Sequence, residues 1–270
     1  MQPDSLRMPA VYLPHGGGPW PFVDPAPFAD PRECKALAEY LATLPAHLPS
    51  RPRALVVVSA HWEAPVPTVM TSAQPPMLYD YYGFPPEAYR ITWPAPGAPE
   101  LATRVRSLLE AEGISTAEDL GRGYDHGAFV PLKLGFPLAD VPTLQLSLQY
   151  GLDPARHLAI GRAIAPLRRE GIFLVGSGMS YHNLREYRSA SPHSVVFDAW
   201  LRRVVAEDPS VRDAELVRWS VAPSARKAHP REEHLLPLMV MAGAAGSDRG
   251  RVAFSDTFGG ARVSAVQFGG

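Results

Sequence analysis

The feature that most constrains the fold is the apolar run ALVVVSA at residues 54–60, which only Ser59 interrupts. A strand with one wet face alternates polar and apolar residues, whereas an unbroken apolar run is typical of a strand buried on both faces. Comparable runs, rich in β-branched residues, recur elsewhere: AVYL (10–13), TLQLSL (143–148), IFLVGSG (172–178) and RVSAVQF (262–268). The chain therefore predicts a central sheet that other elements cover.

Segments with helical periodicity separate these runs. They span residues 34–44, 99–113, 153–171, 194–208 and 232–246. In the third segment, Asp153 followed by Pro154 is typical of an N-cap and a first helical position. The alternation of strands and helices predicts an α/β fold with a central, mostly parallel β-sheet covered by helices on both faces. No fixed repeat and no linker divides the chain, so we expect one catalytic domain over residues 1–270.

Charge and cysteine content exclude several classes of function. The net charge is −1 without a basic block or an acidic tail, so we expect neither nucleic acid nor an anionic membrane surface as a partner. The single cysteine, Cys34, excludes an internal disulfide and a thiolate metal cluster, and we expect it to be a small core residue. No apolar run reaches transmembrane length and the first ten residues lack a signal peptide's apolar stretch, which predicts a cytoplasmic protein. The oligomeric state is left open.

Three histidines follow predicted strands. His15 comes after residues 10–13, His61 directly after 54–60, and His182 in the loop after 172–178. Ligands of open α/β sheets bind beyond the carboxyl ends of the strands. These three imidazoles are therefore expected to share one crevice.

Two further histidines lie in segments where they could take part in chemistry. His126 lies in a turn before an apolar, helical segment, where it would be a mobile acid or base or, alternatively, a capping residue. His234 lies in KAHPREEHLLPL, where Pro230 suits a first helical position. This places His229 at a helix cap and His234 one turn inside, so only one of the two is expected to reach the crevice. The spacing is not that of a zinc protease.

The sequence HGGG at residues 15–18 also occurs in esterases, where it forms an oxyanion hole. Such an enzyme requires a G-x-S-x-G nucleophile turn, and VGSGM around Ser177 lacks that spacing, which argues against an esterase. The remaining histidines, His47, His157 and His193, are interpreted as surface or core residues.

Three or four neutral imidazoles without cysteine partners suit Zn²⁺ or Fe²⁺. An aromatic-rich loop at residues 77–94 favours an aromatic substrate, because its rings would form flat pocket walls. The alternative is a loop that packs on its own scaffold. The rings in question are Tyr79, Tyr81, Tyr82, Phe84, Tyr89 and Trp93.

Taken together, these segments resemble the class III extradiol ring-cleaving dioxygenases, specifically the 4,5-DOPA dioxygenase extradiol group. The matching segments occur in the family's order over nearly the whole chain: LPHGGGPWPFVD, VVVSAHWE, YDYYGFPPEAYRITWPAPG, GYDHGAFVPLKLGFP, VPTLQLSL, LVGSGMSYHNL and HPREEHLLPL.

The resemblance implies a divalent metal held by His15, His61 and His234. It implies that His182 is a further ligand or the acid/base, and that His126 contacts oxygen or substrate. His229 stands where related sequences carry asparagine and is left out of the metal shell. Fe²⁺ would be needed for activity, and Zn²⁺ could occupy the same site.

The implied reaction opens a catechol ring with O₂ and gives a semialdehyde acid. His182 would take a catechol proton, and His126 and His182 would supply the proton for O–O cleavage. The alternatives are a zinc-dependent hydrolase on the same histidines and a non-enzymatic, metal-binding member of the fold. A binding module needs no proton shuttles, so the presence of His126 and His182 argues against the last alternative.

Overall fold

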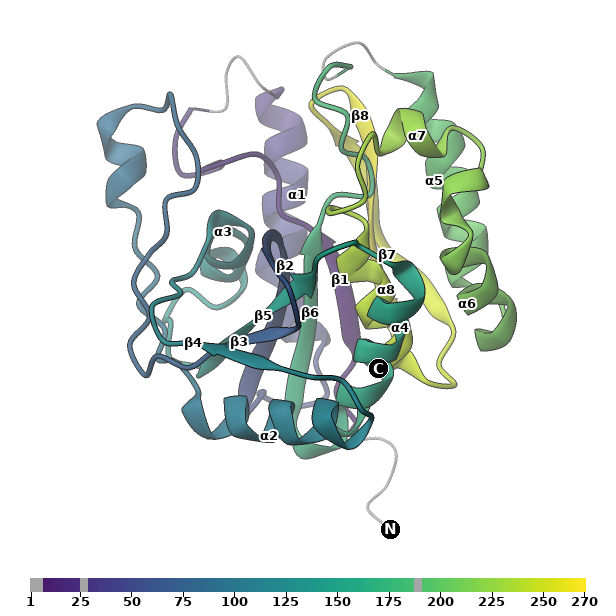
Figure 1. Cartoon of the computed structure of the whole chain (residues 1–270). Helices are drawn as coiled ribbons and strands as arrows, with labels where there is room; N and C mark the ends of the chain where they lie inside the picture. Colours follow the sequence, from purple (N-terminus) through teal and green to yellow (C-terminus); the bar gives the residue numbers. More distant parts are fainter. Residues whose placement is uncertain (1–6, 25–28, 187–190) are drawn as a thin grey trace.

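The computed structural model describes residues 7–24, 29–186 and 191–270, and its strands form one sheet with the order β4-β3-β5-β2-β6-β1-β8-β7 (Figure 1). The strands are β1 (Ala10–Pro14), β2 (Ala54–Ala64), β3 (Thr68–Met70), β4 (Ala117–Asp119), β5 (Thr143–Gln149), β6 (Ile172–Gly178), β7 (Gly250–Phe258) and β8 (Ala261–Phe268). The helices are α1 (Pro31–Thr43), α2 (Pro99–Ala111), α3 (His126–Gly135), α4 (Pro154–Ile164), α5 (Pro192–Val205), α6 (Pro209–Val217), α7 (Ala225–Ala228) and α8 (Leu236–Ala245).

The centre of the sheet is parallel. Strands β5, β2, β6 and β1 are neighbours that run in one direction, and β8 and β7 add an antiparallel edge. At the other edge, β3 pairs antiparallel with β5. Residues 55–58 of β2 are completely buried, so the predicted burial on both faces and the mostly parallel α/β sheet are confirmed. The short strands β3 and β4 and the edge strand β7 were not predicted.

Helices cover both faces of this sheet. Helix α8 packs on β6 and β1 with α4 outside it, while α1 and α3 pack together behind the sheet as viewed in Figure 1. Two glycines of β6 permit the close approach of the backbone at the start of α8 and just before it. A Cβ on Gly176 would lie 2.6 Å from the Pro237 carbonyl oxygen, and one on Gly178 would lie 2.1 Å from the His234 carbonyl oxygen. The absence of side chains there lets the segment with His234 rest on the end of β6.

The helix expected over residues 232–246 begins later, at Leu236, so the prediction that His234 lies one turn inside it is wrong. The predicted N-terminal cap at His229 is also wrong, because His229 is the C-cap of α7. The reason is that the His234 carbonyl oxygen accepts two hydrogen bonds from the sheet end. The donors are Tyr12 Oη on β1, at 2.8 Å, and the amide of Met179, directly after β6, at 3.2 Å. His234 is therefore held in a turn against β1 and β6.

Two other boundaries differ from expectation. Strand β2 continues through Ala64, so His61 lies within the strand, past the last pairing with β6 at Ser59 and inside an irregularity of the β5 ladder. The segment expected as one helix over 153–171 divides into α4 and a 3₁₀ helix at Ala165–Glu170, because Pro166 cannot donate an α-helical hydrogen bond. Asp153 caps α4 as predicted, accepting from the Ala155 amide at 2.8 Å.

Within the described residues, no helix is long and apolar enough to span a bilayer.

Candidate metal centre

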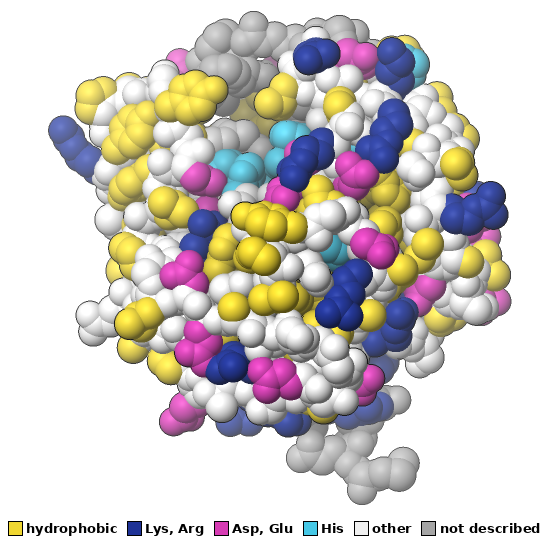
Figure 2. All heavy atoms as spheres, in the orientation of Figure 1, with side chains coloured by type: hydrophobic (Ala, Val, Ile, Leu, Met, Phe, Trp, Pro, Cys, Tyr) yellow, Lys and Arg dark blue, Asp and Glu magenta, His cyan; other side chains and the backbone are white. Residues whose placement is uncertain are grey.

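Five histidines converge at the carboxyl end of the parallel strands. The ring centroids of His15, His61 and His234 form a compact triangle, with separations of 4.8 Å, 4.9 Å and 5.2 Å. The His126 ring lies 4.0 Å from that of His61, and the His182 ring stacks on that of His234 at 3.3 Å. Histidine side chains are visible in a hollow of the upper surface in Figure 2. The structure thus brings together every residue of the predicted site.

His15 follows β1 directly and is 1% exposed. Its Nε2 lies 3.1 Å from Nε2 of His61, and its Nδ1 lies 3.0 Å from Ser177 Oγ on β6. The following glycine leaves room for the wall of the site, because a Cβ on Gly16, where φ is +81°, would overlap the indole of Trp20. That indole donates to the His15 carbonyl oxygen at 2.6 Å and fixes the backbone at the end of the strand.

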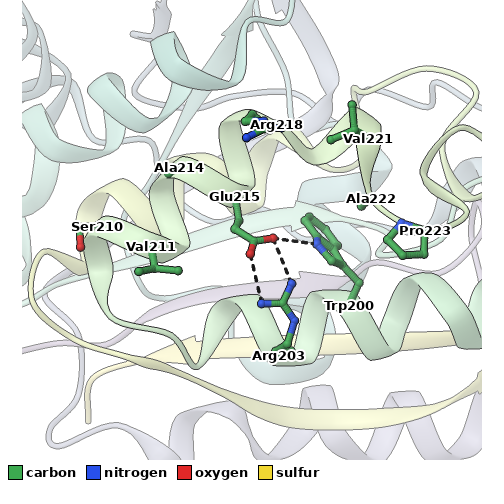
Figure 3. Close-up of a pocket in the computed structure, with 10 residues that line it drawn as sticks. All are labelled: Trp200, Arg203, Ser210, Val211, Ala214, Glu215, Arg218, Val221, Ala222 and Pro223. Carbon is green, nitrogen blue, oxygen red and sulfur yellow. Dashed lines mark hydrogen bonds and ion pairs between the residues drawn. The ribbon is translucent and has the colours of Figure 1, made fainter.

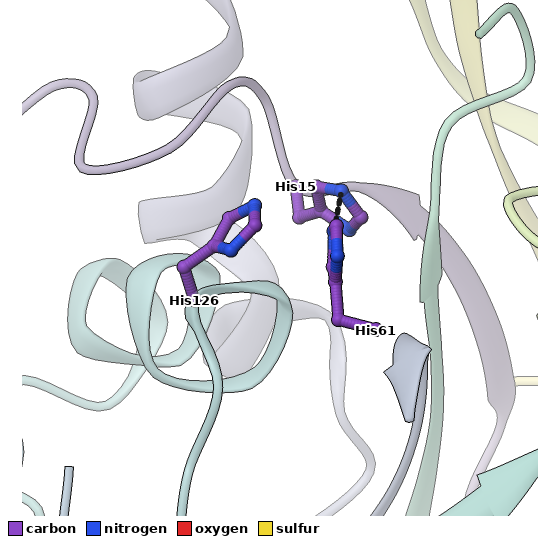
Figure 4. Close-up of side chains that lie close together, drawn as sticks. All are labelled: His15, His61 and His126. Atoms are coloured by element: carbon purple, nitrogen blue, oxygen red, sulfur yellow. Dashed lines mark hydrogen bonds between the residues drawn. The ribbon is translucent and has the colours of Figure 1, made fainter. Parts of the chain in front are cut away.

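His61 and His126 face a shared carboxylate, Asp80. His126 is the first residue of α3, and its Nδ1 and backbone amide lie 2.8 Å and 2.9 Å from Asp80 Oδ1. His61 Nδ1 lies 3.7 Å from Asp80 Oδ2. Figure 4 shows the His126 ring turned toward His15 and His61. Burial raises the pKa of Asp80, but the hydrogen bond and charge of His126 outweigh it and lower that pKa to about 2.

His234 and His182 face a second carboxylate, Glu233. Nδ1 of His234 lies 3.0 Å and Nδ1 of His182 lies 3.4 Å from Glu233 Oε1. The His182 amide donates to the Ala228 carbonyl oxygen at 2.9 Å, which ties the loop after β6 to α7. Neither Glu233 nor Asp80 was predicted from the sequence as a partner of these histidines. The only feature of the sequence that could have pointed to Asp80 is its position as an acid among the aromatic residues of the loop at 77–94.

The residues present fit a divalent metal ion. A carboxylate only accepts, so the Nδ1 of His234 that faces Glu233 carries the proton and Nε2 keeps its lone pair. That Nε2 is buried and has no hydrogen-bond partner among the described residues. An unpaired buried acceptor is costly unless something binds it, and neutral imidazole nitrogens are good ligands of divalent iron and zinc. Ligand atoms of His15, His61 and His126, and of His182, Glu233 and His234, form two groups, each within 4.8 Å.

Burial keeps His15, His61 and His234 neutral. It is the main cause that lowers the pKa of His15 and of His234 well below 6.5, and the neighbouring imidazoles lower both further. The pKa of His61 falls to about 3, again chiefly because of burial, although 22% of its side chain is exposed. Neutral rings can donate lone pairs to a cation without first losing a proton at physiological pH.

Asp125 anchors the segment that carries His126. It is completely buried, caps α3 through the Ala128 amide, and accepts from Ser59 Oγ at 2.7 Å and from Arg122 Nη2 at 2.5 Å. Gln145 also donates to it. Burial raises the pKa of Asp125, and Arg122 opposes this rise. Four donors satisfy the carboxylate, so the start of α3 is held rigidly beside β2.

A cavity of about 560 Å³ opens over the histidines, which is large enough for a single-ring ligand. Apolar side chains line part of it: Trp20, Val23, Phe84, Leu184 and Phe258. Among the aromatic residues predicted as walls, only Phe84 lines this cavity. Tyr79, Tyr81 and Trp93 hydrogen-bond to backbone carbonyl oxygens, and Tyr82 is 91% exposed. Most of the loop therefore packs on its own scaffold, which was the alternative.

A second cavity, of about 590 Å³, lies along α5 and α6 (Figure 3). Its acid, Glu215, pairs with Arg203 at 3.0 Å and accepts from Trp200 Nε1 at 3.2 Å. The residues that line it include no histidine. This cavity therefore lacks the chemistry found at the end of the sheet.

Residues outside the site behave as structural groups. His229 is buried, edge-on to Phe197 and Trp219, and its Nε2 donates to the Ser180 carbonyl oxygen at 3.0 Å. His157 is completely buried on α4, and Cys34 is 4% exposed in the core, as expected. Ser177, the rejected nucleophile, lies within β6 and donates to the Gly127 carbonyl oxygen.

The family model described as the catalytic LigB subunit of aromatic ring-opening dioxygenase matches residues 9–266. A dioxygenase named tasH from Hapsidospora irregularis is 36% identical over 289 residues, covering 98% of this chain and 88% of that protein. A 4,5-DOPA dioxygenase extradiol from Portulaca grandiflora is 40% identical over 203 residues (73% and 74%), and one from Escherichia coli (strain K12) is 35% identical over 245 residues (89% and 86%). The crystal structure of an uncharacterized protein from Escherichia coli K12 matches with a TM-score of 0.79 at 31% identity, over 97% of this chain and 100% of that one.

Proposed function

Because the chain belongs to the family of the catalytic LigB subunit of aromatic ring-opening dioxygenases, we propose that it is an Fe²⁺-dependent extradiol dioxygenase that opens the ring of a catechol with O₂. The observation that carries this proposal is the buried, unpaired Nε2 of His234 beside the rings of His15 and His61. These three neutral imidazoles would hold the metal, and the cavity above them would hold the catechol.

When bound, Fe²⁺ would supply a Lewis-acid and redox centre for the reaction between catechol and O₂. Zn²⁺ fits the same ligands without the redox chemistry, so a zinc-filled protein should be inactive. The native metal and the catechol class are parts of this proposal, as is a cytoplasmic location.

The chain's own residues would manage the protons. His182 is 20% exposed and lies beside His234, so it can accept a proton from a catechol hydroxyl as the catechol enters. His126 holds its Nδ1 proton on Asp80, which leaves Nε2 facing the cavity as a second acid/base. Phe84, Trp20 and Phe258 would pack on the ring and exclude water.

The overall reaction balances without a further reductant. Both oxygen atoms of O₂ enter the product, one carbon–carbon bond of the ring breaks beside the diol, and the product carries an aldehyde and a carboxylic acid. The ring's own electrons reduce O₂, so the protein needs no nicotinamide or flavin.

The test is to load the protein with Fe²⁺ without oxygen, add a catechol, and then admit air. We expect one O₂ consumed for each catechol and a yellow semialdehyde chromophore, with neither in the Zn²⁺-loaded protein. Turnover of a substrate by the Zn²⁺-loaded protein without oxygen uptake would instead establish a hydrolase. A metal-loaded protein that binds catechol and leaves it unchanged in air would support a non-enzymatic member.

A further inference from the structure

Two carboxylates of the site each contact two histidines. Asp80 approaches His126 at 2.8 Å and His61 at 3.7 Å, while Glu233 approaches His234 at 3.0 Å and His182 at 3.4 Å. In every case the contacting atom of the histidine is Nδ1. Each carboxylate therefore joins one predicted metal ligand to one predicted acid/base.

The direction of these contacts fixes which ring nitrogen is free. Ionised carboxylates only accept hydrogen bonds, so a ring that bonds to one through Nδ1 carries its proton there and keeps a lone pair on Nε2. Such carboxylate partners orient metal-bound histidines and raise their basicity. Asp80 thus selects the Nδ1-protonated tautomer of His126, and Glu233 selects that of His234.

The two carboxylates are not surface ion pairs that happen to lie near the site. Among the described residues, the ion-pair partners of Asp80 within 4.0 Å are both histidines, and 20% of its side chain is exposed. The other oxygen of Glu233, Oε2, lies 3.4 Å from Arg231 Nη1, and Arg231 is held in turn by Glu63. Both acids therefore have defined positions that turn an oxygen toward the rings.

The two carboxylates differ in which of their two histidines lies closer. Asp80 is closer to the predicted acid/base, His126, than to the predicted ligand, His61. Glu233 is closer to the predicted ligand, His234, than to His182. On the basis of the metal centre proposed above, we propose that the two acids are positioning residues with divided tasks: Glu233 secures the metal ligand His234, and Asp80 secures the proton-transfer residue His126.

The experiment compares Asp80→Asn and Glu233→Gln with the control Glu170→Gln, an acid that pairs with Arg104 outside the site. Two quantities are measured for each protein: the Zn²⁺ dissociation constant by competition with a chelator, and kcat and KM of the Fe²⁺-saturated protein. Losing an outer partner of a metal ligand weakens metal binding by about 10- to 100-fold. We expect that loss for Glu233→Gln, with kcat at saturating metal reduced by less than about tenfold.

For Asp80→Asn we expect the opposite pattern: Zn²⁺ affinity within about threefold of wild type, and kcat lowered by about 10- to 100-fold with a smaller change in KM. The control should match wild type in both. A general loss of folding would lower metal affinity and kcat together in either variant, so opposite patterns distinguish positioning from structural damage. Parallel losses in both variants, or no change in either, would overturn the proposal.

A measurement that does not depend on turnover completes the test. In Zn²⁺-loaded protein with ¹⁵N-labelled histidine, NMR should show His126 with its proton on Nδ1, and Asp80→Ala, which removes the acceptor, should shift part of that population to Nε2. An unchanged His126 tautomer in Asp80→Ala would refute the role of Asp80. If wild type binds zinc but opens no ring, the proposed function fails alone, and the affinity and tautomer results still decide the roles of the two acids.

Discussion

His15 Nδ1 lies 3.0 Å from Ser177 Oγ, between the end of β1 and the neighbouring parallel strand β6. The Ser177 hydroxyl has one hydrogen and donates it to the Gly127 carbonyl oxygen. Ser177 must therefore accept from His15, so the His15 proton is on Nδ1 and the Nε2 lone pair faces His61. A buried serine in a strand thus sets the tautomer of a predicted metal ligand.

Replacing Ser177 by alanine should weaken Zn²⁺ binding by about tenfold, because Nδ1 of His15 loses its acceptor and the ring loses its orientation. The free energy of unfolding should fall by about 1–3 kcal/mol, since a buried donor is left unpaired. Chelator competition and urea unfolding measure the two effects. Ser147→Ala is the matched control, because Ser147 is also a buried strand serine but bonds to the Thr68 amide, outside the site. Equal zinc affinities in the two variants would contradict the role of Ser177.

Gly127 is the second residue of α3 and packs against the predicted ligand His61. A Cβ there would lie 2.6 Å from Ser59 Oγ and 2.9 Å from His61 Cδ2. Gly127→Ala should therefore displace the His61 ring and weaken metal binding by about tenfold or more. At Gly121 the nearest atom would be 3.5 Å away, so Gly121→Ala should bind metal like wild type. Chelator competition on both variants tests this, and wild-type affinity in Gly127→Ala would show that the ring does not need its present position.

The predicted roles of His61 and His126 can be separated by metal analysis. His61→Ala should lose the metal, because its Nε2 faces that of His15 at 3.1 Å in the centre of the site. His126→Ala should retain the metal and lose turnover, because its Nδ1 is committed to Asp80 and its predicted task is proton transfer. Full metal content in purified His61→Ala protein would mean that the ligand set is wrong. His47→Ala, outside the site, is the control for purification losses.

The sequence was sufficient to locate β1, β2, β5, β6 and β8 and to predict that the histidines lie in one crevice, because two-sided burial leaves continuous apolar runs and because functional groups follow the ends of parallel strands. It did not show that His234 sits in a turn, since the contact between its carbonyl oxygen and Tyr12 Oη joins residues far apart in the chain. The roles of Asp80 and Ser177 as partners of His126 and His15 escape the sequence for the same reason. Glu233 precedes His234 in the chain, but only the turn at that point directs its carboxylate to the ring. A carboxylate or hydroxyl acquires such a role only when folding brings a ring nitrogen to it.

The pH dependence of stability can be tested at His157, which lies on α4 away from the metal centre. Its Nδ1 donates to the Asp153 carbonyl oxygen at 2.7 Å, and its Nε2 accepts from the Gln149 amide at 3.2 Å. Burial is the main cause that lowers the pKa of His157 below 6.5 in the folded protein. Below pH 6.5 the His157 imidazole therefore binds a proton more readily in the unfolded chain than in the folded chain. Its contribution to the free energy of unfolding falls as the pH falls.

This contribution is fully present above pH 6.5 and is lost progressively below it, by at most about 1.4 kcal/mol per pH unit for one histidine. Burial also lowers the pKa of His229, to about 3, so His229 adds a slope of the same sign. Urea unfolding of the metal-free protein between pH 7.5 and 5 should show stability decreasing toward acid. His157→Gln has no group to titrate there and should reduce the slope. A wild-type slope in His157→Gln would show that the imidazole titrates alike in the folded and unfolded chains.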